Sequence, residues 1–163
     1  MTIKKDLKVK FAYYMNKPEL INSLLPEELL ISLIKQDSKF IKYIDNPSDV
    51  IVKTAIAHSP FSLMVLDKSF LTKENILLAL KSDFFILNQL YNKSKGLDHD
   101  FLKEIELEFI SYVEENVYVK KYYRFIKDET IYYKFHSLLK NEEAKIKLKA
   151  LYNSINDVID ILS

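Results

Sequence analysis

Basic and aromatic residues alternate in a segment near the C-terminus, from residue 118 to residue 136. Its candidate partner-binding residues are Lys120, Lys121, Tyr122, Tyr123, Arg124, Lys127, Tyr132 and Tyr133. Lysine and arginine neutralise phosphate and aromatic rings stack on bases, so the segment suits RNA or single-stranded DNA. Tyrosine and arginine are also enriched at protein-interface hot spots. A third interpretation is an amphipathic helix whose tyrosines are half-buried in a core.

An acidic run on the same part of the chain opposes nucleic-acid binding. Residues 98–163 carry 10 basic and 13 acidic side chains, a net charge of −3. Two acids in a cleft can act as general acid and general base, but Glu104 and Glu108 are expected on a solvated helix face. We therefore predict an acidic surface, able to dock a basic partner, rather than a catalytic pair. Its residues are Glu104, Glu108, Glu114 and Glu115.

The remaining chemistry-bearing residues do not form a catalytic or metal-binding motif. His58, His99 and His136 lie far apart, and none has a histidine or carboxylate at the i, i+4 spacing of a helical metal site. The sequence Asp98-His99-Asp100 opens a predicted helix, where acids favour the helix dipole. Nucleophilic catalysis needs an oxyanion site, commonly a glycine turn, and no such turn motif is found. We predict no enzymatic activity, no metal and no cofactor.

The composition favours a helical chain. With 163 residues, 48% of them hydrophobic, the chain can bury one ordinary core. Its single glycine, Gly96, disfavours hairpins and phosphate-binding loops. The net charge of +1 gives no overall attraction to nucleic acid or membrane, and cysteine is absent. Because no long apolar run is present either, we expect a cytoplasmic protein that does not bind membranes.

The N-terminal part of the sequence repeats with a step of 21 residues. Asn16, Asp37 and His58 follow this step. Apolar positions follow it too, pairing Leu29 with Val50, Ile31 with Val52, Ile34 with Ala55, Phe40 with Phe61 and Ile44 with Val65. A third copy aligns Asp83 with Asp37, 46 residues earlier. That offset equals two periods plus four inserted residues, which we place near 67–70.

Each repeat unit is predicted to contain a helix, a polar break and a shorter helix. Pro26 and Pro47 suit the first helical turn, where the missing N–H costs nothing. Asn46 is a good N-cap before Pro47, and Thr72 can cap the third copy.

Outside the repeat, apolar stripes predict further helices. One spans residues 3–15 and begins the array as a cap, and the segment 92–96, with the only glycine, marks the boundary. Beyond it we expect a helix at 98–116 and a last helix at about 142–162. These C-terminal helices are expected to pack back on the array.

The stretch Asp45–Pro60 resembles a unit of the short bacterial and viral α-solenoid repeats, including the leucine-rich repeat variant class. The resemblance rests on the Asn46-Pro47 start and the Ala57-His58 end of its apolar helix, and it extends over roughly residues 16–91. It implies a curved stack of helices that offers a surface to a macromolecular partner. This chain departs from the families in keeping about three units and in lacking a cysteine cluster.

We therefore expect an all-α fold: a helical-repeat, α-solenoid-like array (1–91) and a C-terminal helical bundle (98–163), packed as one compact domain. The expected function is non-enzymatic protein binding, as by a phage-type, viral inhibitor or adaptor that occludes host machinery such as a nucleic-acid enzyme. The alternative is RNA or single-stranded DNA binding through 118–136. The oligomeric state is left open.

Overall fold

Helices are the only regular secondary structure that a computed structural model of the chain contains among its described residues, 10, 13–93 and 97–162. The prediction of an all-α fold is confirmed. The chain divides into two compact units, residues 1–86 and 87–163. No helix in the described part of the chain has the length and apolarity needed to cross a membrane.

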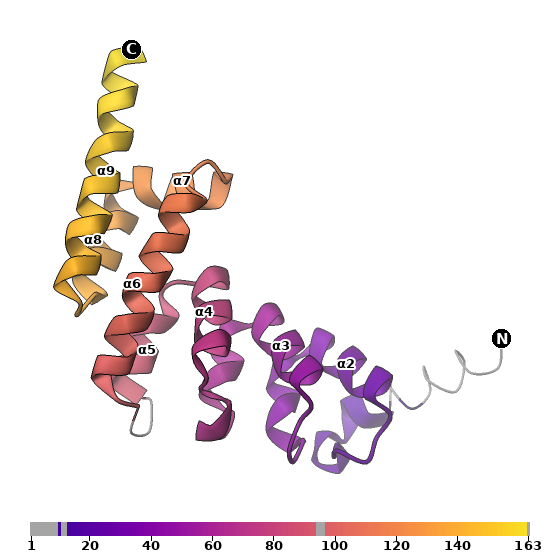
Figure 1. Cartoon of the computed structure of the whole chain (residues 1–163). Helices are drawn as coiled ribbons and strands as arrows, with labels where there is room; N and C mark the ends of the chain where they lie inside the picture. Colours follow the sequence, from indigo (N-terminus) through magenta and orange to yellow (C-terminus); the bar gives the residue numbers. More distant parts are fainter. Residues whose placement is uncertain (1–9, 11–12, 94–96, 163) are drawn as a thin grey trace. The chain divides into compact units, whose positions relative to one another are not determined.

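In the first unit, α-helices alternate with shorter 3₁₀ helices (Figure 1). In chain order they are η1 (Pro18–Leu20), α2 (Glu27–Gln36), η2 (Ser38–Tyr43), α3 (Asp49–His58), η3 (Pro60–Met64), η4 (Lys68–Phe70) and α4 (Lys73–Ser82). Helix α2 packs on α3, and α3 packs on α4. Most of the predicted helix at 3–15 lies outside the described residues, although 13–16 are helical.

Hydroxyl side chains cap the second and third α-helices of this unit. Ser48 accepts an N–H from the first turn of α3, and its hydroxyl donates to Glu27 of α2 at 2.7 Å. Thr72 caps α4 as predicted, accepting the N–H of Asn75 at 3.3 Å. Asn46, the predicted cap of α3, instead adopts a left-handed φ of 49°, a conformation that asparagine tolerates. The cap is therefore the serine directly before the helix.

The three helices α2, α3 and α4 end in the same way. Their C-cap residues Asp37, Ser59 and Asp83 have φ of −146°, −148° and −147°, and each donates its N–H to the carbonyl four residues earlier. These residues are 22 and then 24 positions apart. Buried residues follow the same offsets: Leu29, Ile51 and Asn75; Leu30, Val52 and Ile76; Leu33, Ala55 and Ala79; Ile34, Ile56 and Leu80.

The structural step between the first two helices is thus one residue longer than the predicted 21. The 21-residue step pairs the buried Leu29 with Val50, which is 53% exposed, and the buried Phe40 with Phe61, which is 46% exposed. Adjacent helix positions point about 100° apart, so an offset of one residue exchanges core for surface. The predicted 46-residue offset from Asp37 to Asp83 agrees with the cap geometry.

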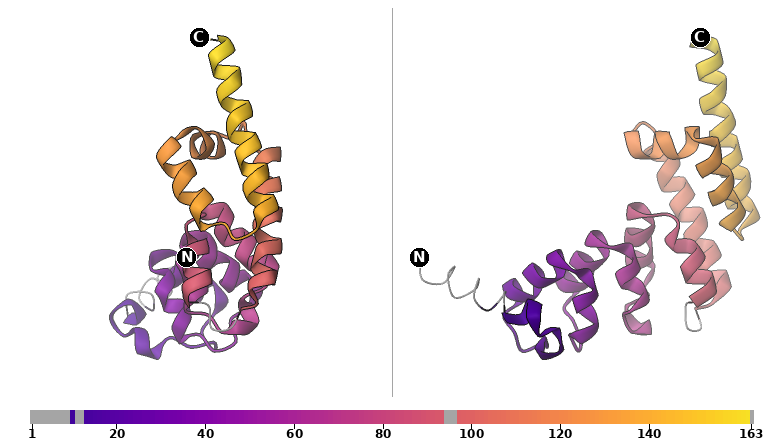
Figure 2. Two further views of the ribbon diagram at one scale, coloured as in Figure 1. Left: turned by 90° about the vertical axis from the view of Figure 1, so that its left-hand side faces the viewer. Right: turned by 180° about the vertical axis from the view of Figure 1, so that it is seen from behind.

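The second unit contains the longer helices. They are α5 (Ile86–Lys93, beginning at the last residue of the first unit), α6 (His99–Glu115), α7 (Lys120–Lys127), α8 (Glu129–Leu138) and α9 (Glu142–Leu162). Helix α9 packs on α6, α7 and α8, and α8 runs alongside it (Figure 2). The helices predicted at 98–116 and 142–162 are confirmed as α6 and α9. Of the predicted boundary segment 92–96, residues 94–96 lie outside the described part.

Aromatic residues form the centre of the second unit. Phe109 of α6 and Phe125 of α7 both meet Phe135 of α8 edge to face, with ring centroids 6.0 and 5.1 Å apart. All three rings are buried. The inward faces of α6, α7 and α8 therefore pack against one another. This packing determines which side of α7 remains exposed.

Candidate binding surface

Helix α7 is apolar on one side and basic on the other. Tyr122, Phe125 and Ile126 are spaced three and four residues apart, and all three are buried. The exposed side carries four cations, which we call the α7 basic face: Lys120, Lys121, Arg124 and Lys127. The amphipathic pattern therefore directs all the positive charge of the helix toward solvent.

Most of the α7 basic face is not neutralised internally. Among the described residues, Lys120, Arg124 and Lys127 form no ion pair with a carboxylate. The Nζ of Lys127 instead lies 5.7 Å from the centre of the Tyr123 ring, a cation–π distance. Arg124 is the only arginine of the sequence, and its planar guanidinium suits carboxylates and phosphates. An anionic surface can approach these three cations without displacing an internal carboxylate.

A shallow depression of about 370 Å³ adjoins this face. It is lined by Arg124, Lys127, Asp128 and Ile131. The Asp128 carboxylate caps α8 by accepting the N–H of Ile131 at 3.0 Å, so it is already engaged at a helix N-terminus. The depression therefore offers two cations beside an apolar side chain.

Two of the predicted binding tyrosines are buried. Tyr122 is 5% exposed and meets Tyr112 edge to face with centroids 5.6 Å apart. Tyr132 is 3% exposed and stacks on Tyr152 at 4.1 Å. Burial is the main reason that the pKa of each buried hydroxyl is raised above its ordinary value of 10. Neither buried ring is available to stack on a ligand, because both already pack inside the second unit.

The exposed aromatic side chains lie elsewhere on this unit. Tyr118, in the turn before α7, is 95% exposed, and its neighbour Val119 is 50% exposed. Tyr133 of α8 is 56% exposed, and Tyr123 is half-buried. The candidate partner-binding residues predicted from the sequence did not include Tyr118. Its position outside the apolar stripe of α7 is a signal of exposure.

All four acids of the predicted acidic surface are exposed: Glu104, Glu108, Glu114 and Glu115. Glu114 pairs with Lys147 of α9 at 2.9 Å, which fastens α6 to α9. Such solvated pairs contribute at most about 1 kcal/mol. The acids therefore contribute negative potential to the surface of α6, on the same unit as the α7 basic face.

Glu106, between Glu104 and Glu108 in the sequence, is only 1% exposed. Its carboxylate accepts the hydroxyl of Tyr91 at 2.6 Å and the backbone N–H groups of Lys140 and Asn141 at 2.9 and 2.7 Å. The backbone donors lie at the start of α9, the positive end of the helix dipole. Both oxygens are engaged, so Glu106 joins helices rather than acting as a base. An isolated glutamate on the apolar stripe of α6 is the sequence signal for this role.

The Glu106 contacts also affect Tyr91. Burial first, and then the hydrogen bond to the Glu106 carboxylate, raise the pKa of the Tyr91 hydroxyl well above its ordinary value. Asn141 completes the junction by donating from its side chain to the carbonyl of Lys103 at 2.8 Å and by capping α9. The phenol therefore stays protonated and donating.

The histidines are distributed over both units. His58 is exposed at the end of α3, His99 is exposed at the start of α6, and His136 of α8 is half-buried. Burial lowers the pKa of His136 below its ordinary value of 6.5, with Lys145 and Lys149 acting in the same direction. In the part of the chain that the structure describes, no three histidine or carboxylate side chains converge as a metal site would require.

Comparison with known proteins adds no family to this description. No protein-family model matches the chain, and neither a curated protein nor a solved structure is found to be similar to it.

Proposed function

We propose that this protein is a non-enzymatic binding module that attaches to an acidic surface of a protein partner through the α7 basic face. The observation that carries the proposal is the row of cations without carboxylate partners, Lys120, Arg124 and Lys127, next to the fully solvated ring of Tyr118. Arginine and tyrosine supply much of the binding energy at protein interfaces. Packing of α7 on α8 and α9 holds the face in one orientation, which lowers the entropic cost of binding.

A protein partner is favoured over RNA or single-stranded DNA for two reasons. Tyr122 and Tyr132 are buried, which removes two of the four predicted tyrosine rings from any stacking platform. The same unit exposes the acids of α6, which repel a phosphate chain running past α7. Nucleic-acid binding therefore remains the second candidate, and it depends on Tyr118, Tyr123 and Tyr133.

The first unit serves this function as a scaffold. We propose that α2, α3 and α4, with their 3₁₀ helices, are successive units of a short α-solenoid similar to the leucine-rich repeat variant class. The repeated C-cap geometry at Asp37, Ser59 and Asp83 supports this. Binding by such a protein would act by occlusion, as expected of a phage-type inhibitor or adaptor in the cytoplasm. A host nucleic-acid enzyme that exposes an acidic surface fits such an inhibitor.

The test is affinity purification of partners with the full chain and with the double variant Arg124→Glu/Lys127→Glu. The matched control is Lys35→Glu/Lys39→Glu, which makes the same charge change at two exposed positions of the first unit. We expect one stoichiometric protein partner for wild type and control, and an affinity at least about 100-fold weaker for the double variant, because two charge-assisted contacts reverse sign.

Binding of a fluorescent single-stranded oligonucleotide is measured in parallel at low and high salt. Tight binding that falls steeply with salt and is lost in Arg124→Glu/Lys127→Glu would favour the nucleic-acid candidate. A protein partner bound equally well by both double variants would place the interface away from α7.

A further inference from the structure

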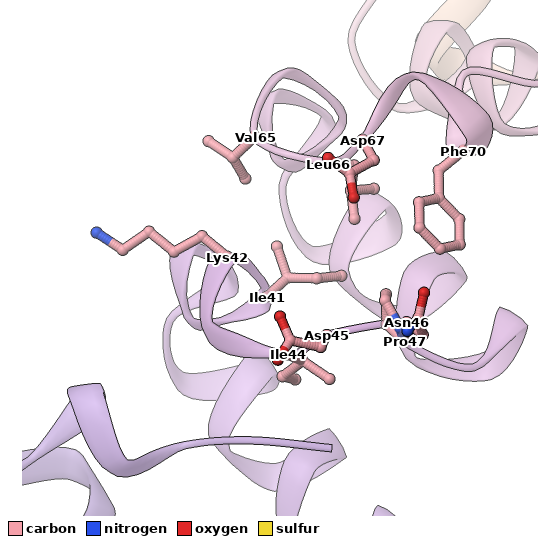
Figure 3. Close-up of a pocket in the computed structure, with 10 residues that line it drawn as sticks. All are labelled: Ile41, Lys42, Ile44, Asp45, Asn46, Pro47, Val65, Leu66, Asp67 and Phe70. Atoms are coloured by element: carbon pink, nitrogen blue, oxygen red, sulfur yellow. The ribbon is translucent and has the colours of Figure 1, made fainter.

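The described part of the chain has a cavity and a depression that differ in what their surfaces can hold. The cavity, of about 520 Å³, lies in the first unit between the turns that follow η2 and η3 (Figure 3), and its accessible surface is mostly polar. The depression, of about 370 Å³ beside the α7 basic face, has a mostly apolar accessible surface. The cations of α7 alone do not account for an apolar surface at their edge.

The depression, which we call the α7–α8 depression, lies at the corner where α7 gives way to α8. Asp128 is the only residue between the two helices. Its N–H donates to the carbonyl of Arg124 at 3.0 Å. Its carboxylate accepts the N–H of Ile131 at 3.0 Å, and its carbonyl accepts the N–H of Tyr132 at 2.8 Å. These hydrogen bonds hold the corner in one geometry, which lowers the entropic cost of binding there.

Carbon atoms form most of the surface of the α7–α8 depression. Ile131 is half-buried, and the long stems of Arg124 and Lys127 contribute methylene groups to the same lining. Arg124 and Lys127 are three residues apart on one helix, so their side chains leave the same side of α7. The depression therefore combines an aliphatic surface with two cationic groups in adjacent turns of one helix.

The charge around the depression is positive. Residues 120–131 carry four basic and two acidic side chains, a net charge of +2. One of the acids, Asp128, is engaged by the N–H of Ile131 in the first turn of α8, where the helix dipole offsets its charge. The other acid, Glu129, is exposed in the same turn. An occupant that brings carboxylates to Arg124 and Lys127 is therefore favoured over one that brings cations.

We propose that the α7–α8 depression receives one large aliphatic side chain, of the size of leucine, from an acidic segment of the partner protein. The inference rests on the proposed function, because it specifies which part of the partner meets the α7 basic face. Contact with Ile131 and the two stems removes apolar surface of both molecules from water. A bare phosphate would satisfy the cations but leave that surface wet.

The acids of the segment are placed by the same geometry. On a helical segment, carboxylates three or four residues from the aliphatic side chain lie on the same face. They can then form charge-assisted hydrogen bonds with Arg124 and Lys127 while the aliphatic side chain occupies the depression. Charge complementarity attracts acidic segments in general, and the aliphatic side chain distinguishes one acidic segment from another.

The test is a titration of the isotope-labelled full chain, followed by the backbone amide signals of Arg124, Lys127, Asp128 and Ile131. The first probe is an alanine-based helical peptide with capped ends, in which glutamates stand three and four residues to either side of one central leucine. A second peptide replaces the leucine by alanine, and a third replaces the glutamates by glutamine. We expect saturable shifts with the first peptide, affinity about fivefold weaker with the second, and affinity at least about tenfold weaker with the third.

Variants separate the apolar contact from the charges. Ile131→Ser should remove the preference for the leucine peptide over the alanine peptide, and Ile131→Leu should keep it, because only the serine removes the aliphatic wall. Arg124→Gln/Lys127→Gln should weaken binding of both peptides by about tenfold and leave the preference in place. The control Ile146→Ser, at a 69% exposed position of α9 outside the depression, should bind as wild type. Well-dispersed amide spectra confirm that each variant is folded.

Several outcomes would overturn the inference. Equal affinity for the leucine and alanine peptides would reject the aliphatic contact, and the proposed function would still stand if Arg124→Gln/Lys127→Gln weakens both. A preference for leucine that survives Ile131→Ser would place the contact elsewhere. No shift of the four amides with any peptide would reject the depression as a site. Larger shifts of the same amides with a single-stranded oligonucleotide would assign the depression to a nucleic-acid base instead. Failure of the proposed function itself is seen separately, as partner binding that Arg124→Glu/Lys127→Glu leaves unchanged.

Discussion

At the scale of single residues, Glu106 is a buried carboxylate that joins three helices of the second unit. It lies on α6, and its carboxylate holds Tyr91 of α5 and the first backbone N–H groups at α9. A buried carboxylate is costly to desolvate unless donors surround it, as they do here. Removing it leaves those donors buried and unpaired, so the loss exceeds the net value of the hydrogen bonds.

We expect Glu106→Ala to lower the free energy of unfolding of the second unit by about 3 kcal/mol. Denaturant unfolding of both proteins measures this. The matched control is Glu104→Ala, two residues away on the same helix but exposed, which should change stability by less than about 0.5 kcal/mol. Similar values for the two variants would contradict the structural role of Glu106.

At the scale of elements, the sequence predicts the helices better than their register. The stripes that predict 98–116 and 142–162 correspond to α6 and α9, and Thr72 caps α4 as its type suggests. The 21-residue step pairs residues of similar type. It does so because apolar residues occur both at the buried positions of a helix and at the exposed positions one residue before them. Only burial separates Leu29 from Val50. Sequence alone cannot supply that distinction, since it depends on which neighbours cover a position.

The candidate surface shows the same limit. Lysine and arginine positions on α7 are exposed as their charge suggests, whereas tyrosine can occupy either environment. Tyr122 turns inward because it shares a face with Phe125 and Ile126, and Tyr132 stacks on Tyr152 from a helix far along the chain. A helical wheel can indicate the first case. The second requires the tertiary arrangement.

The inserted element η4 gives a prediction at this scale. Asn75 occupies the buried position that Leu29 and Ile51 fill in the preceding helices, and its amide donates to the carbonyl of Phe70 in η4 at 2.9 Å. Its Oδ1 is buried without a partner. The polar residue at this core position therefore binds the longer connection that precedes α4.

We expect Asn75→Ala to release η4. Hydrogen exchange of the amide of Leu71, which is bonded to the carbonyl of Lys68, should accelerate about tenfold, and stability should fall by about 1 kcal/mol. The loss is limited because the variant also removes the unpaired oxygen. Ser69→Ala, at an exposed position in the same turn, is the control and should leave exchange unchanged. Unaltered exchange in Asn75→Ala would show that η4 is held by other contacts.

At the scale of the whole molecule, charge is balanced within each unit. Residues 1–86 carry 12 basic and 10 acidic side chains, and residues 87–163 carry 12 and 13. Association is therefore governed by local surfaces rather than by net charge. The α7 basic face illustrates this, because it lies on a unit whose 12 basic and 13 acidic side chains give a net charge of −1.

Each of the two compact units buries hydrophobic residues of its own, which leads to a prediction about cooperativity. Ile56 lies in the core of the first unit and Phe109 in the core of the second, and both are fully buried. If each core supports its own unit, Ile56→Ala should cost about 3 kcal/mol in the first unit only. Amides of α3 should then lose about 100-fold in exchange protection, while amides of α6 keep theirs. A parallel loss of protection in α3 and α6 would instead mean that the chain unfolds as the single cooperative domain expected from its length.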